Sequence, residues 1–385
     1  MQAGSQPKST TIFLKKCGIN LLLVFISLGF ALGVMELALR IYNPLGFRIK
    51  GDKIILPVNK NEIAHYDQSS KLDKIVYIRR NSLGFRGEEP PPDFADRLTL
   101  LTIGGSTTEC LALDDTKTWP NLLGKKLEKV FRPFWFNNAG LSGNSTYGHI
   151  VLMQDYITQL KPKVALVLVG INDIGLETSS DFDQRMTKRL SLRSLESFLS
   201  WASDYSEVAA ASLNLKRYFF PKVVLSVPDQ EIDLTTLPQL DLTTEQKLQV
   251  LELHKTKYLP PYAARLKKLI DISQTQHIDL VFITQPAVYD RLVDDFTGVD
   301  LGKIQVKPGI NGELAWELLE LYNETTRKVG KDNNILVIEL ARHLPKSSRL
   351  FYDTMHYTNE GARKVADIVY NQLLPYLSTK YPQFH

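Results

Sequence analysis

The sequence predicts an α/β protein in which a parallel sheet lies between layers of helices, with a separate apolar helix at the N-terminus. Continuous apolar and β-branched runs at residues 98–103 and 164–169 are typical of strands buried on both faces. Helical patterns lie between such runs, and strands that alternate with helices form parallel units with right-handed crossovers. An uncharged stretch at residues 17–35 adds a helix of a different kind.

Residues 17–35 are long enough to cross a bilayer, which takes roughly 17–25 residues in a helix. Three lysines precede the stretch, and the first acidic residue near it follows at Glu36. Excess positive charge marks the cytoplasmic side of such a helix, so we expect residues 1–16 in the cytoplasm and the main domain in the periplasm or extracellular space. A cleaved signal peptide is the alternative, and a buried core helix fits poorly because the stretch has no polar face.

Residues 36–95 have little periodicity and several prolines, which predicts a tether and N-terminal extension with a short strand at residues 74–78. Within it, residues 81–87 read Asn-Ser-Leu-Gly-Phe-Arg-Gly. One interpretation is an arm that lays Arg86 beside a substrate. The other is a turn that docks Phe85 on the main domain, which is the commoner outcome for an arginine beside glycines.

The main domain spans residues 96–385 and contains five predicted strands, at residues 98–103, 134–136, 164–169, 280–283 and 335–338. Predicted helices lie at residues 120–130, 151–160, 262–273 and 359–374. Residues 177–261 interrupt this alternation as an insertion, with helical stretches at residues 190–199, 206–219 and 243–258. An insertion of this length either covers the site or steers a partner, and the sequence leaves both open.

The composition excludes several classes of function. With 385 residues, 44% of them apolar and 23% charged, the chain has the make-up of a globular protein. A net charge of +4 without a basic stripe gives no reason to expect nucleic acid as a partner. The two cysteines, Cys17 and Cys110, do not suit a disulfide framework, and no Cys/His spacing suggests a metal site.

Polar residues with catalytic chemistry follow the ends of predicted strands. Ser106 comes after Gly104 and Gly105, which allow a tight turn, and Asn172 follows the strand at residues 164–169. In a parallel sheet the carboxyl ends of the strands meet at one edge, where ligands bind. Ser106 can act there as a nucleophile, and the Asn172 amide can donate to an oxyanion. Each of them alone is also typical of an ordinary turn.

A carboxylate and an imidazole lie three residues apart near the C-terminus, at Asp353 and His356. One turn of chain brings such side chains to the same side, so we expect His356 to act as general base for Ser106 while Asp353 orients the ring. Thr358 has the position of an N-cap for the last helix. The Gly-rich turn at residues 138–144 offers further backbone N–H groups to an oxyanion.

In their order and context these residues resemble the blocks that name the SGNH, or GDSL-like, hydrolases. The resemblance covers residues 96–385 and is weakest in the insertion. It implies a three-layer α/β/α sandwich with a flavodoxin-like, five-stranded parallel sheet. It also implies that no metal or organic cofactor takes part, and it assigns a catalytic triad of Ser106, Asp353 and His356 and an oxyanion hole formed by Ser106, Gly143 and Asn172.

Three details qualify the resemblance. Gly140 competes with Gly143 for the second block, and we prefer Gly143 because a polar pair follows it. Gly105 stands where the family usually carries an aspartate, which leaves the hydrogen bonding of that loop in question but not the nucleophile. Residues 81–87 and 284–286 look like stretches found in membrane-anchored bacterial members.

Three functions are compatible with this interpretation. The first is a membrane-anchored, extracytoplasmic serine esterase that cleaves acyl esters, such as O-acetyl groups, on glycans or lipids. The second is an O-acyltransferase that uses the same triad and passes the acyl group to a sugar hydroxyl instead of water. The third is a membrane-tethered binding module without turnover, against which the presence of every motif residue argues. We expect the esterase.

Overall fold

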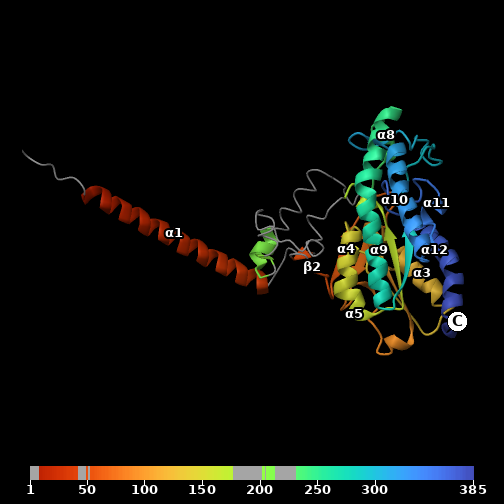
Figure 1. Ribbon diagram of the computed structural model, residues 1–385, viewed down its shortest axis with the longest axis horizontal. Coiled ribbons are helices and arrows are strands. Elements are labelled where there is room, and N and C mark those ends of the chain that lie inside the picture. The colour runs from red at the N-terminus through yellow and green to blue at the C-terminus, as the bar shows by residue number, and fades with distance from the viewer. Residues whose placement is uncertain (1–7, 42–48, 51–52, 177–201, 204, 213–230) are drawn as a thin grey trace, which may run out of the picture. The chain divides into compact units, whose positions relative to one another are not determined.

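The computed structural model (Figure 1) describes residues 8–41, 49–50, 53–176, 202–203, 205–212 and 231–385. The chain divides into two compact units. The first, here called the anchor unit, contains Met1–Ile55 and Arg189–Ser226, and the second, the sheet unit, contains Leu56–Lys188 and Val227–His385. The predicted helix at residues 190–199 and the later part of the one at residues 206–219 lie outside the described residues.

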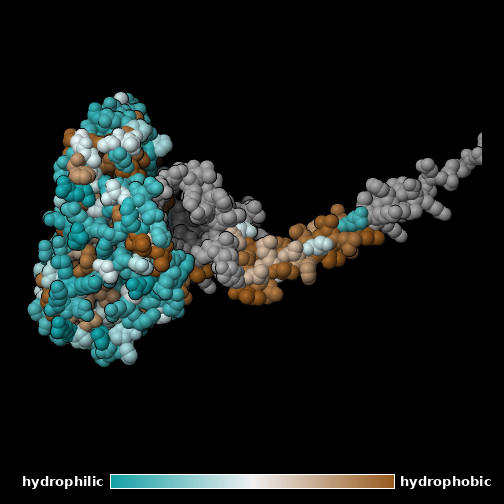
Figure 2. Space-filling view, turned by 180° about the vertical axis from the view of Figure 1, so that it is seen from behind, coloured by the Kyte–Doolittle hydropathy of each residue, from teal (hydrophilic) through white to brown (hydrophobic). Residues whose placement is uncertain are grey.

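The anchor unit contains one long apolar helix, α1 (Lys8–Ile41). Its segment Ile19–Ile41 is long and apolar enough to cross a membrane, with a mean hydropathy of 2.3. Figure 2 shows this segment as mostly hydrophobic on its surface. A membrane-spanning helix and an N-terminal signal sequence both have these properties. The other described parts of the unit are the short hairpin of β1 (Ile49–Lys50) and β2 (Lys53–Ile54) and the helical residues 207–212.

The sheet unit is built on a six-stranded sheet in the order β12-β9-β8-β6-β7-β5. Five of these strands are parallel to one another. Their order is flavodoxin-like, because β6, the first of the five in the sequence, lies between β7 and β8. They are β6 (Leu98–Ile103), β7 (Phe134–Asn138), β8 (Val164–Val169), β9 (Asp279–Thr284) and β12 (Leu336–Ile338). The predicted five-stranded parallel sheet is confirmed. The short β5 (Arg86–Gly87) extends its edge by pairing antiparallel with β7.

Helices cover both faces of this sheet (Figure 1). On one face α3 (Trp119–Leu127) packs against α12 (Asn359–Lys380), and on the other α9 (Leu259–Thr275) packs between α4 (Thr146–Leu152) and α10 (Gly312–Asp332). The shorter helices are α2 (Ser106–Glu109), α5 (Thr158–Leu160), α8 (Thr244–Leu253) and α11 (Leu340–His343). Two hairpins are formed by β3 (Asn61–His65) with β4 (Ile75–Arg79) and by β10 (Gln305–Lys307) with β11 (Ile310–Asn311). The remaining turns are π-helical at Met153–Ile157 and His254–Tyr258 and 3-10 helical at Phe94–Asp96, Asp115–Lys117, Ile171–Asp173, Leu234–Thr236 and Pro382–Phe384.

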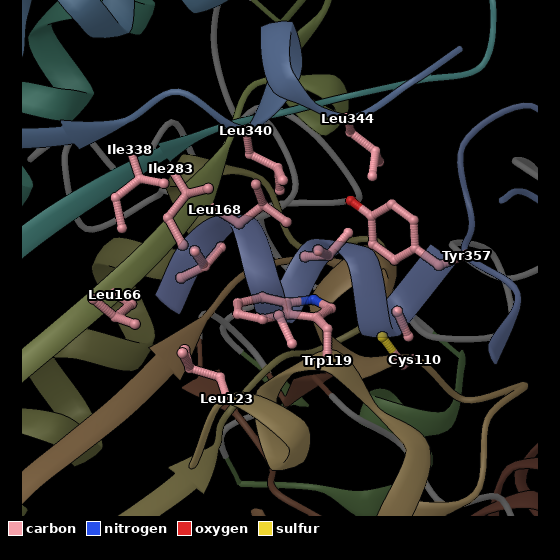
Figure 3. Close-up of a cluster of buried hydrophobic side chains, with 14 of the residues drawn as sticks. Cys110, Trp119, Leu123, Leu166, Leu168, Ile283, Ile338, Leu340, Leu344 and Tyr357 are labelled. Atoms are coloured by element: carbon pink, nitrogen blue, oxygen red, sulfur yellow. The ribbon is translucent and has the colours of Figure 1, made fainter. Parts of the chain in front are cut away.

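The largest buried cluster lies between the sheet and the α3/α12 layer. Alternate residues of the strands supply its floor, and Trp119 of α3 lies fully buried on it (Figure 3). The neighbouring strands contribute Leu166, Leu168 and Ile283, while Leu123 closes the cluster from α3. Because all six residues of both β6 and β8 are buried, these two central strands are held rigidly, and the loops at their carboxyl ends start from fixed positions.

Residues 56–95, within the predicted N-terminal extension, belong to the sheet unit. The β3/β4 hairpin includes the strand expected at residues 74–78, and β5 joins the main sheet. Phe85 is buried, which agrees with the turn interpretation of residues 81–87. The extension therefore packs as part of the sheet unit from residue 56 onward.

Candidate active site

Ser106, His356 and Asp353 meet at the carboxyl edge of the sheet. Ser106 begins α2, directly after the turn that follows β6. Its Oγ lies 2.7 Å from Nε2 of His356, and Nδ1 of His356 lies 2.6 Å from Oδ2 of Asp353. Oδ1 of Asp353 accepts the backbone N–H groups of Met355 and His356 at 2.8 and 2.7 Å. With Nδ1–H donated to the carboxylate, Nε2 is the nitrogen that can accept the serine proton.

The loop before α12 fixes the His356 ring. The Tyr352 N–H donates to the His356 carbonyl at 3.0 Å, and the Tyr352 ring stacks on the imidazole with centroids 5.6 Å apart and 12° between the planes. Thr358 is the N-cap of α12, as the sequence predicts, and its hydroxyl accepts the Gly361 N–H at 3.1 Å. The His356 side chain is only 8% exposed, so the orientation of its ring is set by the protein rather than by solvent.

Arg86 supports the far end of α2 and is not aimed at a substrate. Its buried guanidinium donates to the backbone carbonyls of Glu109, Cys110 and Leu113 at 2.6, 2.8 and 2.9 Å. It also pairs with Asp115 at 2.7 Å. These carbonyls lie at the end of α2 and in the loop after it, where Arg86 supplies a buried donor to each of them, and the Cys110 carbonyl also accepts the Leu113 N–H at 3.0 Å.

Glu109, the last residue of α2, forms a buried ion pair with Arg80. The side chains of Arg80 and Glu109 are 2% and 0% exposed. The same carboxylate accepts the Ser142 hydroxyl and the Ser142 N–H, the latter at 2.5 Å. Ser142 precedes Gly143 in the loop after β7, so one buried carboxylate joins the helix that carries Ser106 to the loop of the predicted oxyanion hole.

Asn172 lies beside the Ser106 turn, in the 3-10 turn after β8. Its Nδ2 donates to the Asn144 carbonyl at 2.9 Å, which uses one of the two amide hydrogens. A Cβ added to Gly105 would lie 2.3 Å from that Nδ2. A side chain at residue 105 is incompatible with this position of the amide. The glycine that departs from the family pattern therefore lets Asn172 approach the backbone next to Ser106.

Gly143 and its rival Gly140 have different surroundings. A Cβ on Gly140 would lie 2.4 Å from the Glu109 nitrogen, so Gly140 is required by the packing of the loop on α2. Gly143 has a positive φ of 79°, and a Cβ there would meet nothing within 4 Å. The Leu141 N–H donates to the Gly104 carbonyl at 3.0 Å, which holds this loop against the Ser106 turn. The oxyanion role of Gly143 stays a prediction.

A second buried ion pair lies under Asn172. Asp173 is 1% exposed and accepts the Arg265 guanidinium of α9 at 3.1 Å. It also accepts the Thr146 N–H at 3.1 Å and the Thr146 hydroxyl at 2.5 Å. The Arg265 guanidinium carbon lies 4.1 Å above the Tyr147 ring. Asp173 therefore fixes the turn that carries Asn172 to the first turn of α4.

Sequence reasoning missed both ion pairs. Glu109 and Asp173 lie within three residues of predicted site residues, and that proximity is the signal that could have found them. Their partners give no such signal, because Arg80 and Arg265 lie 29 and 92 residues away in the sequence.

His149 lies in α4 and is buried. It lines a small cavity behind the site together with Gly105, Asn172 and Gln285. Burial lowers the pKa of His149 to about 3. The imidazole is therefore neutral over the whole range in which the protein is expected to work.

Removing Arg80 should destabilise the protein strongly. Arg80→Met leaves the Glu109 carboxylate buried without its counter-charge, which we expect to lower the free energy of unfolding by about 3–5 kcal/mol. Arg79→Met is the matched control, because its side chain is 71% exposed and should contribute less than about 1 kcal/mol. Chemical denaturation of the full chain in detergent measures both. Equal stability of the two variants would contradict the buried pair.

Acid should destabilise the protein through His149. Because the folded-state pKa is about 3 against an ordinary histidine pKa of 6.5, the unfolded chain alone binds the proton between pH 6.5 and 3. The free energy of unfolding should therefore fall as the pH falls through that window, by about 4–5 kcal/mol in total. We expect His149→Gln to flatten this slope and His65→Gln, at an exposed position on β3, to leave it unchanged. Unfolding at a series of pH values tests this, and parallel slopes would refute it.

Several known proteins are similar to this chain. Residues 102–364 match the GDSL-like lipase/acylhydrolase family. Esterase TesA from Pseudomonas aeruginosa is 31% identical over 75 residues, which cover 20% of this chain and only 37% of that esterase. Two solved structures are also similar. The acetyl xylan esterase AlAXEase is 16% identical, with a TM-score of 0.39, and the match covers 71% of this chain and 98% of that one. The acetylxylan esterase Axe2 from Geobacillus stearothermophilus is 13% identical, with a TM-score of 0.39, and the match covers 71% of this chain and 93% of that one. The chain belongs to the GDSL-like lipase/acylhydrolase family of serine ester hydrolases.

Proposed function

We propose that the protein is a membrane-anchored serine esterase that works through an acyl-enzyme on Ser106, outside the cytoplasm. The observation that carries the proposal is the continuous hydrogen-bonded series of Asp353, His356 and Ser106, with heavy-atom distances of 2.6 and 2.7 Å. Distances of this size suit proton transfer between a nucleophile and its general base.

In the proposed reaction His356 Nε2 takes the hydroxyl proton as Ser106 Oγ attacks the ester carbonyl. Asp353 keeps the resulting imidazolium in place. When the tetrahedral intermediate collapses, the bond to the alcohol oxygen breaks, and that oxygen takes the proton from His356. Water then attacks the acyl-enzyme with His356 again as base, which releases the acid and restores Ser106.

The negative charge that develops on the carbonyl oxygen needs donors already in place. We propose the backbone N–H groups of Ser106 and Gly143 and the second amide hydrogen of Asn172 for this role. The first amide hydrogen of Asn172 is held by the Asn144 carbonyl, so the group cannot rotate freely. A donor fixed before the reaction needs no reorganisation in the transition state.

We propose an O-acetyl ester on a glycan or lipid as the substrate class. Close packing around the nucleophile supports a short acyl group: the Asn172 amide lies against Gly105, and the Tyr352 ring covers one face of the His356 imidazole. Neither the alcohol nor the length of the acyl chain is determined by the triad itself.

The proposed location rests on α1. We propose that residues 17–35 span the membrane with residues 1–16 in the cytoplasm, that residues 36–95 form the extension, and that residues 96–385, with their insertion at 177–261, form the hydrolase domain outside. The apolar segment Ile19–Ile41 and the lysines before it support this arrangement.

A fluorophosphonate probe should label Ser106 in the full chain in detergent, because the probe reacts with serines activated by a base. We expect Ser106→Ala to abolish labelling and His356→Ala to reduce both labelling and hydrolysis of p-nitrophenyl acetate by about 10⁴-fold or more. Peptide mass spectrometry locates the adduct. Ser273→Ala, which removes a buried hydroxyl of α9, is the control and should label normally.

Hydrolysis that persists in Ser106→Ala would refute the nucleophile. A longer acyl ester cleaved faster than the acetyl ester would refute the short acyl group. Transfer of the acetyl group to an added glycan in place of water would favour the acyltransferase over the esterase.

Asn172→Ala should lower kcat by about 10²–10³-fold with little change in KM, because the lost donor acts on the transition state more than on the bound ester. Steady-state kinetics with p-nitrophenyl acetate separates the two constants. Asn333→Ala, at the C-terminus of α10, removes an amide away from the sheet edge and should change neither. A raised KM with unchanged kcat would instead make Asn172 a substrate-binding residue.

A further inference from the structure

The end of α1 holds a segment of the insertion. Glu36 of α1 accepts three hydrogen bonds from the start of the helical residues 207–212: from the Ser206 hydroxyl at 2.8 Å and from the Glu207 and Val208 N–H groups at 3.0 Å each. The first N–H groups of a helix have no partner within it and require an acceptor from elsewhere. Here the acceptor comes from a residue 170 positions earlier in the chain.

Arg40 completes the contact one turn further along α1. Its Nε donates to the Glu36 carboxylate at 2.8 Å, and its Nη2 donates to the Tyr205 carbonyl at 2.7 Å. Glu36 and Arg40 thus bind backbone groups of one segment, residues 205–208: a carbonyl at its start and two N–H groups at its end. We call this set of contacts the Glu36 clasp.

The position of the clasp on α1 is informative. Glu36 is the first charged residue after the proposed membrane span, and its neighbours Met35 and Leu37 are 50% and 60% exposed. A carboxylate in the hydrocarbon region of a bilayer is costly unless it is paired and hydrogen-bonded, and this cost falls toward the boundary, where the carboxylate still needs hydrogen-bond donors. The insertion supplies the backbone donors that this carboxylate needs. Tyr205 beside it is 68% exposed, and tyrosine is enriched where a membrane meets water.

We propose that the Glu36 clasp fastens the insertion to the anchor helix at the membrane surface, so that the hydrolase is attached to its anchor noncovalently as well as through the chain. The proposal rests on the proposed membrane anchoring. It gives the insertion a role other than a lid: its residues 205–212 bind the end of α1. The contact is chemically specific. On α1 a carboxylate and a guanidinium lie four residues apart; the carboxylate accepts the first N–H groups of a helix, and the guanidinium donates to the carbonyl just before that helix.

Hydrogen–deuterium exchange on the full chain in phosphatidylcholine–phosphatidylglycerol vesicles tests the clasp. The amides of Glu207 and Val208 should exchange slowly in the unaltered protein, and Glu36→Ala should accelerate their exchange by about tenfold or more. Met35→Ala, the adjacent position of α1, keeps the carboxylate and should leave this exchange unchanged. Peptides from α12 serve as the internal reference for the sheet unit.

Sedimentation of the same vesicles separates the two levels of the proposal. A chain that sediments with the vesicles and loses protection in Glu36→Ala supports the clasp. A chain that sediments but exchanges equally fast with and without Glu36 overturns the clasp and leaves the anchoring intact. A chain that stays in the supernatant overturns the anchoring, and with it the clasp.

Discussion

The position of Ser106, the proposed nucleophile, depends on a helix that is too short to be stable alone. Isolated helices of one turn are unstable, because fixing the first turn yields few hydrogen bonds. The four residues of α2 are instead held from outside. Besides Arg86, the Trp119 indole donates to the Thr107 carbonyl at 2.9 Å, and the Asn138 amide donates to the Thr108 carbonyl at 2.8 Å. Three segments far apart in the chain thus fix the orientation of Ser106, and the site forms only when the sheet unit has folded around it.

Two buried ion pairs extend this dependence to the proposed oxyanion donors. Glu109 with Arg80 lies under the loop of Gly143, and Asp173 with Arg265 lies under the turn of Asn172. Burying charge is costly, and an apolar pair of similar size often gives equal or greater stability. In both cases the carboxylate also accepts a backbone N–H of a neighbouring segment, Ser142 of a loop or Thr146 at the start of α4, which an apolar side chain cannot do. We infer that these pairs fix the positions of the segments around the site more than they raise the free energy of unfolding.

The sequence alone was sufficient to predict the site residues that follow the ends of strands. The carboxyl ends of β6 and β8 lie side by side in any sheet with this strand order, so Ser106 and Asn172 had to be neighbours. The Asp353–His356 spacing and the Thr358 N-cap are local signals, and both appear as expected. Arg80 and Arg265 could not be predicted, because a surface arginine and a buried one look alike until the fold selects their partners. Likewise the division of the insertion between two units follows from tertiary contacts and has no mark in its composition.

The insertion begins only a few residues after Asn172, so a contact made by the insertion could disturb the site through the chain. The structure resists such a disturbance at two points. Asp173 is fixed to Arg265, and the Gly175 N–H donates to the Tyr322 hydroxyl of α10 at 2.9 Å. That hydroxyl also lies 3.1 Å from Nδ1 of His254, near the C-terminal end of the insertion at residues 177–261. The chain near both ends of the insertion is therefore held by the same tyrosine, Tyr322. The proposed catalytic residues all belong to the sheet unit. The proposed membrane attachment and the proposed ester chemistry therefore reside in different units of the chain.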